Sequence, residues 1–315
     1  MLDGFNRKIN YLRISVTDLC NFRCKYCMPE DGVCKINRED ILTYEELYYI
    51  THLFVEGGVD KVRITGGEPL IRKGIIHFIE ALGHIEKIKD LAMTTNGSYL
   101  KKYAKDLKKA GLDRVNISLD TLNPKTFKKL TKGDLKDVLE GIDVAFDEGL
   151  KIKINTVLLK GINDDEINNF LNLTMDRDID VRFIEVMPIG PVADYAKEKF
   201  ISGDEIIKTH NLRKIENDDI SSPAKLYKLE GSRGRIGFIE PMSHNFCENC
   251  NRMRLTADGK LKPCLHSDSV VDIKTPLRKG EDIRRYIDEA MSIKPLRHHL
   301  LEGESIESAM NSIGG

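Results

Sequence analysis

Short runs of aliphatic and β-branched residues alternate with amphipathic stretches through roughly the first two thirds of the chain. Six of these runs, five to seven residues long, are predicted strands: 11–16, 61–65, 91–95, 114–119, 151–157 and 181–186. The helices predicted between them begin at capping signals, which are Thr43 with Glu46, Ser202 with Glu205, and Asn123 before Pro124. Alternation at this spacing predicts parallel strands joined by right-handed crossovers. Six such units form either an open doubly wound sheet or an incomplete (β/α) barrel, and the periodicity leaves both open.

Residues that are unusual in a buried sheet follow the ends of four predicted strands. They are Asp18-Leu19-Cys20, Gly66-Gly67-Glu68-Pro69, Asn96-Gly97 and Asp120. In both candidate folds the reactive groups belong at the carboxyl ends of parallel strands. The functional site is therefore expected at this end of the sheet.

The alternation stops at 213–224, a charged stretch with serine and proline that is predicted to be a linker. Short strand-like pieces follow at 225–229, 235–239 and 252–256, and then a helical pattern at 280–291. The chain is therefore predicted to divide into a larger N-terminal unit, 1–215, and a smaller C-terminal unit, 216–315.

Composition and charge exclude several classes of protein. The 315 residues carry 49 Lys and Arg against 50 Asp and Glu, a net charge of −1, so the chain as a whole does not suit a polyanion. No uncharged apolar run is long enough to span a membrane, and the N-terminus lacks the apolar segment of a signal peptide, so a cytoplasmic location is predicted. There is no tryptophan and no pattern typical of a base-stacking surface, so no nucleic-acid partner is expected.

Six of the seven cysteines fall into two tight groups, and Cys34 stands alone. Cysteines in a cytosolic chain of this size ligate metals or do chemistry more often than they form disulfides. Cys20, Cys24 and Cys27 form the first group, directly after a predicted strand. Three soft ligands suit an iron–sulfur cluster with one open iron, whereas a closed zinc site needs a fourth ligand. A zinc knuckle that takes its fourth ligand from a distant residue is the alternative.

The first group resembles the signature of radical S-adenosylmethionine (SAM) enzymes. The match comprises C-x3-C-x2-C with Tyr26 before the last cysteine, and the GGEP motif that begins at Gly66. This resemblance implies an incomplete (β/α)6 TIM-type barrel that carries a 4Fe–4S cluster and SAM. The SAM contacts that it implies are Tyr26, Gly66, Gly67, Glu68, Ser118 and Met187.

Cys247, Cys250 and Cys264 form the second group. With His244 or His266 as a fourth ligand, their spacing is also typical of a zinc ribbon. Arg252 and Arg254 alternate along a predicted strand, so both point to one face beside the cysteines. Two guanidinium groups there favour bidentate phosphate capture, although a solvated charged strand is the simpler alternative.

Cations recur on the predicted strands, at Arg13, Lys61, Arg63, Lys153 and Arg182, and the chain has no Walker motif. Buried charges on strands are expensive unless they are paired or bind an anion. Ion pairs with Glu or Asp neighbours, such as Glu68 and Glu185, are one explanation, and a triphosphate cradle is the preferred one.

The segment 238–265 and the terminal Gly314 and Gly315 resemble the MoaA family, the GTP 3′,8-cyclases of molybdenum-cofactor biosynthesis. This resemblance implies a second 4Fe–4S cluster in a C-terminal auxiliary domain, and catalytic roles for Arg13, Gly314 and Gly315. Implied GTP contacts are Arg13, Lys61, Arg63, Thr94, Lys153, Arg182, Arg252, Met253 and Arg254. Implied partners are an electron donor and a downstream pterin synthase, with the chain a monomer or a homodimer. The alternatives are a radical SAM enzyme of another subgroup, such as a peptide-modifying enzyme, and a non-enzymatic zinc module that recognises nucleotide or nucleic acid.

Overall fold

The computed structural model describes residues 1–27, 36–217, 219–298, 306 and 310. Twelve strands form one sheet in the order β12-β11-β10-β1-β2-β3-β4-β5-β6-β9-β8-β7. The strands are β1 Tyr11–Ser15, β2 Lys61–Thr65, β3 Asp90–Thr95, β4 Arg114–Ser118, β5 Lys151–Leu158, β6 Ile179–Glu185, β7 Arg213–Ile215, β8 Ala224–Lys228, β9 Ile236–Ile239, β10 Arg252–Leu255, β11 Lys260–Lys262 and β12 Val271–Asp272. The helices are α1 Tyr44–Glu56, α2 Ile75–Gly83, α3 Leu100–Lys109, α4 Pro124–Thr131, α5 Leu135–Asp147, α6 Ile167–Asn172, α7 Ala193–Glu198, α8 Gly203–Thr209, α9 Lys274–Arg278 and α10 Arg284–Ser292. None of the described helices combines the length and apolar character needed to cross a membrane.

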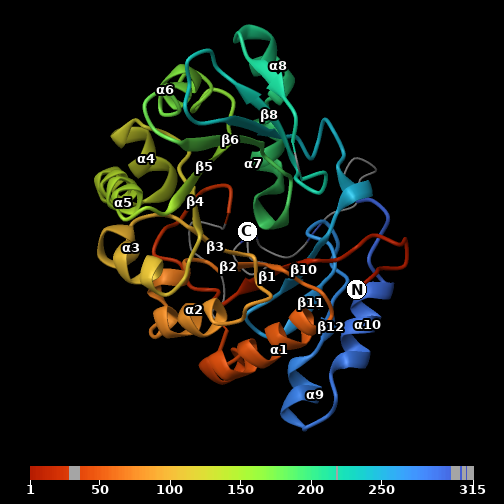
Figure 1. The fold of residues 1–315 in the computed structure, drawn as a ribbon. Coiled ribbons are helices and arrows are strands. Elements are labelled where there is room, and N and C mark those ends of the chain that lie inside the picture. Colours follow the sequence, from red (N-terminus) through yellow and green to blue (C-terminus); the bar gives the residue numbers. More distant parts are fainter. Residues whose placement is uncertain (28–35, 218, 299–305, 307–309, 311–315) are drawn as a thin grey trace.

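Strands β1 to β6 are parallel and lie side by side in chain order. A doubly wound sheet reverses its strand order at a switch point, whereas a barrel does not. Figure 1 shows the strands curving around an interior with the helices outside them. The strand order therefore decides in favour of the incomplete barrel.

Local signals set most of the element boundaries. Thr43 and Glu46 form the predicted capping box at α1, and Asn123 caps α4 with Pro124 in its first turn. At α8 the prediction was wrong in one detail. The Ser202 hydroxyl accepts from the backbone N–H of Asp204 and forms no capping box with Glu205.

The C-terminal third of the chain extends this sheet at both edges. Strand β9 pairs parallel with β6, and β10 pairs parallel with β1, while β7, β8, β11 and β12 add antiparallel partners outside them. The prediction of a linker at 213–224 is wrong at both ends of this range. Strand β7 occupies its first three residues, and β8 starts at its last residue. The boundary at 215 between two domains stays a prediction.

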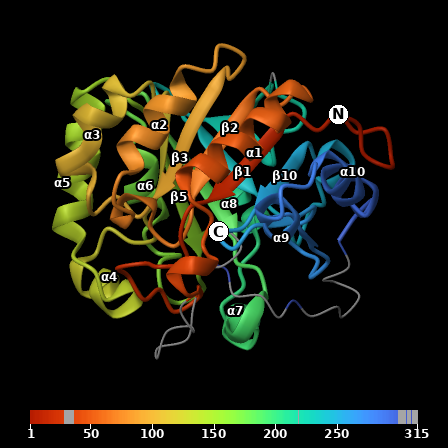
Figure 2. The same ribbon diagram turned by 90° about the horizontal axis from the view of Figure 1, so that it is seen from below.

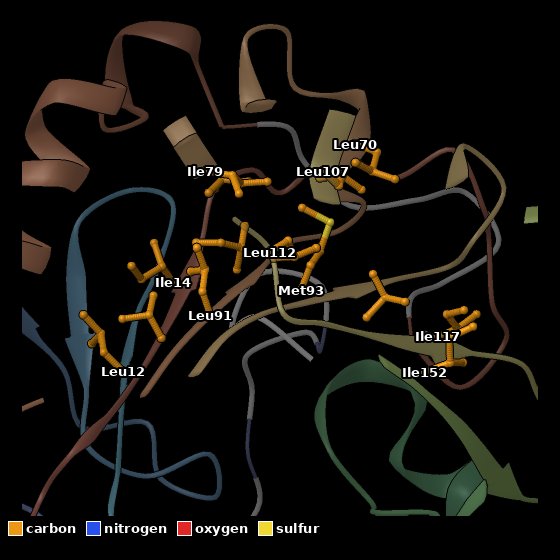
Figure 3. Packing of buried hydrophobic residues seen from close by; sticks show 14 of the residues in the cluster. Leu12, Ile14, Leu70, Ile79, Leu91, Met93, Leu107, Leu112, Ile117 and Ile152 are labelled. Atoms are coloured by element: carbon orange, nitrogen blue, oxygen red, sulfur yellow. The ribbon is translucent and has the colours of Figure 1, made fainter. Parts of the chain in front are cut away.

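The main core lies between the barrel strands and the helices around them. Leu12 and Ile14 on β1, Leu91 and Met93 on β3, and Leu107 on α3 are almost completely buried in it (Figure 3). Alternate strand residues point to opposite faces of the sheet, so the positions between these face the barrel interior. Those interior positions carry the polar groups described next.

Candidate active site between two cysteine groups

One cavity of about 340 Å³ inside the barrel brings both cysteine groups together. Its walls include most of the residues that the sequence pointed to: Cys20, Cys24, Cys27, Cys247, Cys250, Cys264, Arg13, Arg63, Arg182, Arg252, Arg254, Thr94, Tyr26, Gly66, Gly67, Ser118 and Met187. Four predicted residues do not line it, namely Lys61, Glu68, Lys153 and Met253. Cys34, Gly314 and Gly315 lie outside the described residues.

The first cysteine group follows β1 on a loop that packs against the two glycines after β2. The backbone N–H of Gly67 donates to Thr17 O at 2.8 Å. A Cβ atom on Gly66 would lie 2.7 Å from Thr17 O, and one on Gly67 would lie 2.3 Å from Leu19 O. Because such distances are far below van der Waals contact, only glycine lets the two strand ends come this close.

Glu68, the next residue, is completely buried beneath this loop. Its carboxylate accepts hydrogen bonds from the backbone N–H groups of Leu70 and Asn96 and from the Thr95 hydroxyl. Burial raises its pKa to about 7. These contacts make Glu68 a brace between two strand ends, and its predicted contact with SAM stays a prediction.

Asp120, which lies just after the end of β4, also supports the loop of the first cysteine group. Its carboxylate accepts from the Tyr26 hydroxyl at 2.6 Å and from the backbone N–H of Val157 at 2.9 Å. Burial raises the pKa of Asp120 to about 6. Tyr26, a residue of the motif, is thereby held against the barrel wall.

The thiols of the first group have acids near them. Burial raises the pKa of Cys24 well above its usual value, and Cys27 and Asp120 add to the rise. Burial also raises the pKa of Cys20, and the nearby carboxylate of Glu68 adds to this rise. The backbone N–H of Phe22 lowers the pKa of Cys20, and the guanidinium of Arg23 lowers it more weakly. A bound cation would reverse these shifts, because metal ions bind the thiolate.

The second group is assembled from the turn before β10 and the loop after β11. Burial opposes ionisation of Cys250, but Lys294 and then Arg252 outweigh it and lower the pKa of this thiol. Lys294 Nζ lies 3.5 Å from Cys250 Sγ. Arg7, from the N-terminal segment, donates to the carbonyl oxygen of Cys247 at 2.8 Å. Neither cation was found from the sequence.

The spacing of the thiols bears on which metal they suit. A tetrahedral zinc with Zn–S bonds of about 2.3 Å needs sulfurs about 3.8 Å apart. Among the described residues, neither cysteine group has its three sulfurs all within 4.8 Å of one another. His244, one proposed fourth ligand, instead pairs with Asp204 at 3.0 Å, and the Nε2 of His266 lies 3.0 Å from Met187 Sδ. Each group thus offers three thiols, and both histidines proposed as a fourth ligand have other partners, which favours an iron–sulfur cluster over a four-ligand zinc site.

Three arginines lie side by side on adjacent strands of the cavity wall. Arg13 on β1 is in register with Arg254 on β10 and with Arg63 on β2. Burial and then Arg254 lower the pKa of Arg13 well below its usual value, and burial and then Arg252 lower that of Arg254 to about 10. Like charges directly opposite each other destabilise a sheet. The row therefore concentrates positive charge on this wall of the cavity, which suits an anionic ligand.

Several polar atoms in the same wall are buried with no hydrogen-bond partner in the described part of the chain. They are Nε of Arg63, Nε of Arg182, Oγ1 of Thr94 and Oδ1 of Asn155. Orphaned buried groups are costly, and a polar ligand would satisfy them. Asn155, together with Tyr11, lines the cavity and was missed by the sequence, because neither residue is charged or part of a motif.

The two lysines among the predicted strand cations form ion pairs with aspartates. Lys61 pairs with Asp219 at 2.6 Å, and Lys153 pairs with Asp180 at 3.3 Å. The alternative of ion pairs with nearby acids is therefore confirmed for Lys61 and Lys153, although Glu68 and Glu185, named as examples, are not the partners. Glu185 accepts hydrogen bonds from the Ser243 hydroxyl and from backbone N–H groups of Gly203, Met242 and Ser243. Met253 is buried in the hydrophobic core.

Two protein-family models together match most of the chain. Residues 14–174 match the model described as "Radical SAM superfamily", and residues 179–300 match "Molybdenum Cofactor Synthesis C". The chain therefore belongs to the radical SAM superfamily, and its barrel fold, its first cysteine loop and the Gly66-Gly67 pair agree with this class.

Curated relatives narrow this class. A protein named GTP 3′,8-cyclase from Peptoclostridium acidaminophilum is 54% identical over 100% of this chain and 98% of its own length. One of the same name from Alkaliphilus oremlandii (strain OhILAs) is 52% identical over 100% of both chains. The chain therefore belongs to the GTP 3′,8-cyclase family, and the two alternatives raised by the sequence are set aside.

Solved structures support the fold alone. Streptococcus suis SuiB bound to S-adenosylmethionine aligns with a TM-score of 0.61 at 18% identity, covering 90% of this chain and 68% of that one. Methylornithine synthase (PylB) aligns with a TM-score of 0.50 at 19% identity, covering 64% of this chain and 61% of that one.

Proposed function

We propose that this chain converts GTP to 3′,8-cyclo-7,8-dihydroguanosine 5′-triphosphate, the first step of molybdenum cofactor biosynthesis. The observation that carries this proposal is the single cavity lined by both cysteine groups and by the arginine row. Such a cavity can hold a reactive cofactor at one end and a polyanionic substrate against the other wall. The family relationship supports the same reaction.

The cofactors follow partly from the family. As a radical SAM protein the chain uses a 4Fe–4S cluster and SAM, and we assign the cluster to Cys20, Cys24 and Cys27. We assign a second 4Fe–4S cluster to Cys247, Cys250 and Cys264, which form no disulfide and line the same cavity as the first group. When bound, these groups supply the one-electron chemistry that generates a 5′-deoxyadenosyl radical.

The chain's own residues position the reactants. Tyr26, Gly66, Gly67, Ser118 and Met187 would contact SAM beside the first group. The arginine row, with Arg182 and Thr94, would hold the triphosphate. Its guanidinium groups lie side by side, and Nε of Arg63, Nε of Arg182 and Oγ1 of Thr94 have no hydrogen-bond partner among the described residues. Arg252 lines the cavity beside this row and would add charge there. Lys61 and Lys153, which pair with Asp219 and Asp180 outside the cavity lining, would act on the triphosphate from a greater distance. Holding the sugar close to the radical source and away from water is the protein's main contribution.

Further partners complete the proposal. An electron donor would reduce the clusters, and a pterin synthase would take the product, with the enzyme a monomer or a homodimer. The six described cysteines are free thiols, which is typical of a reducing compartment, and we place the protein in the cytoplasm. Gly314 and Gly315, with Arg13, are assigned catalytic roles on the resemblance of the sequence.

Anaerobic incubation with GTP, SAM and a strong reductant tests the function. We expect 5′-deoxyadenosine and the cyclised nucleotide to form together, and the reconstituted protein to contain about eight iron atoms and eight sulfides. Release of 5′-deoxyadenosine with no cyclised nucleotide would contradict the proposed substrate. A colourless protein with bound zinc would contradict both clusters.

A further inference from the structure

Lys294 is a buried cation that contacts the second cysteine group. This residue lies just after the end of α10 in the chain and is 2% exposed. The Nζ atom donates to Cys250 Sγ at 3.5 Å, to Arg252 O at 2.8 Å and to Pro263 O at 2.6 Å. These three partners are a thiol and two carbonyl oxygens, and no carboxylate is among the described groups it contacts.

The missing carboxylate matters because an ammonium group is expensive to bury unless a negative charge compensates it. Two backbone carbonyls satisfy its hydrogen bonds but do not cancel its charge. The group of opposite charge available at this place is the thiolate of Cys250, next to those of Cys247 and Cys264. Lys294 therefore matches a site whose cysteines are ionised and bound to metal.

The fold holds this lysine firmly against the cysteines. Helix α10 is anchored by the buried residues Ile287, Ala290 and Met291. Beyond it, Arg7 donates to Pro295 O at 2.7 Å and to Leu296 O at 2.9 Å, and the same side chain reaches Cys247 O. Figure 2 shows the N-terminal segment beside α10. The N-terminal segment and the residues directly after α10 thus both contact the second group.

We propose that Lys294 is a positioning residue of the second iron–sulfur cluster, whose ammonium group orients Cys250 and raises the reduction potential of that cluster. The inference rests on the proposed function, because it assumes a cluster on Cys247, Cys250 and Cys264. A positive charge and a hydrogen bond at a ligating sulfur stabilise the more negative, reduced state. Around Cys20 and Cys24 of the first group the charged neighbours include Glu68 and Asp120, with Arg23 acting more weakly on Cys20.

The test uses the full chain, reconstituted anaerobically, in Lys294→Gln and Lys294→Arg variants. Each is made in wild-type protein and in a background with Cys20, Cys24 and Cys27 changed to alanine, so that the second cluster is titrated alone by electron paramagnetic resonance. Lys279→Gln is the matched control, because Lys279 is exposed on the same C-terminal segment. We expect a lower reduction potential in Lys294→Gln and an unchanged one in Lys294→Arg and Lys279→Gln.

The outcomes separate this inference from the proposed function. If the parent protein binds no second cluster, the proposed function is wrong. If it binds two clusters and Lys294→Gln has the parent's potential, only the role of Lys294 is wrong. Loss of the second cluster from Lys294→Gln but not from Lys294→Arg would support the role, since the charge then holds Cys250. Loss from both variants would overturn it, because the lysine would then serve packing alone.

Discussion

The two cysteine groups each offer three thiols to one cavity, but the charged side chains near them differ. Around the first group, Asp120 and Glu68 oppose ionisation of Cys24 and Cys20. Around the second group, Lys294 and Arg252 favour ionisation of Cys250. Counting ligands alone would make the two groups equivalent.

The difference extends to how each group is built. The first lies within eight residues of one loop and is braced by neighbouring strand ends. The second depends on chain segments more than two hundred residues apart, since Arg7 contacts Cys247. An acid-lined group suits a strongly reducing centre, and a cation-lined group suits a site that faces an anionic substrate. The predictions below test this division of roles.

Removing one ligand from each group should have the largest effect. We expect Cys24→Ala to abolish both 5′-deoxyadenosine formation and GTP cyclisation, by at least about 100-fold. Cys250→Ala should keep 5′-deoxyadenosine formation and lose the cyclised nucleotide. Both products are measured in one anaerobic assay. Loss of 5′-deoxyadenosine from Cys250→Ala would show that the groups do not act separately.

Arg252→Ala and Arg254→Ala test the cationic side of the comparison. Each removes a charged donor beside the second group, so GTP affinity should fall by about 10- to 100-fold, the effect of losing one charged hydrogen bond. SAM cleavage should be largely unchanged. Equilibrium binding of GTP checks this, with Arg177→Ala, an exposed ion pair with Asp143, as the control. Normal cyclisation by both variants would refute the phosphate role.

Lys153 should make GTP binding depend on pH. Burial, followed by Arg182, lowers the pKa of Lys153 to about 7. Below that pH the lysine is charged and attracts the triphosphate, whereas above it binding must take up a proton. GTP affinity should therefore fall by up to about tenfold per pH unit above pH 7. Binding measured from about pH 6 to about pH 9 tests this, and Lys153→Met should lose this contribution to the slope. An identical slope in the variant would assign the effect to another group.

Of these variants, Gly67→Ala should have the smallest effect, and this effect should be limited to the first cysteine group. The added Cβ would lie 2.3 Å from Leu19 O and push the cysteine loop away. We expect a loss of about 1–3 kcal/mol in the free energy of unfolding, together with less iron at the first group. Gly4→Ala, whose Cβ would meet its nearest atom at 3.4 Å, is the control. Equal iron loss from the second group would mean that the loop supports both.

Sequence reasoning found the groups whose meaning lies in local spacing. The six cysteines, the double glycine, and Arg252 beside Arg254 are read from short motifs, and the structure places all of them on one cavity. Sequence reasoning also placed Glu68 beside the bound SAM. In the structure Glu68 is buried, and its hydrogen bonds connect two strand ends. Sequence reasoning missed Lys294 and Asp219, because an isolated lysine or a loop aspartate carries no sign of the distant residue it will contact.

The sequence by itself determined the spacing of the two cysteine groups, the strand–helix alternation and the alternation of arginines along a strand. These are properties of neighbours in the chain, and covalent spacing controls them directly. Only the tertiary structure decided the strand order that makes a barrel, the register that sets three arginines abreast, and the cation at Cys250. Those depend on which faces pack together, since the free energy of burying side chains selects contacts between residues far apart in sequence.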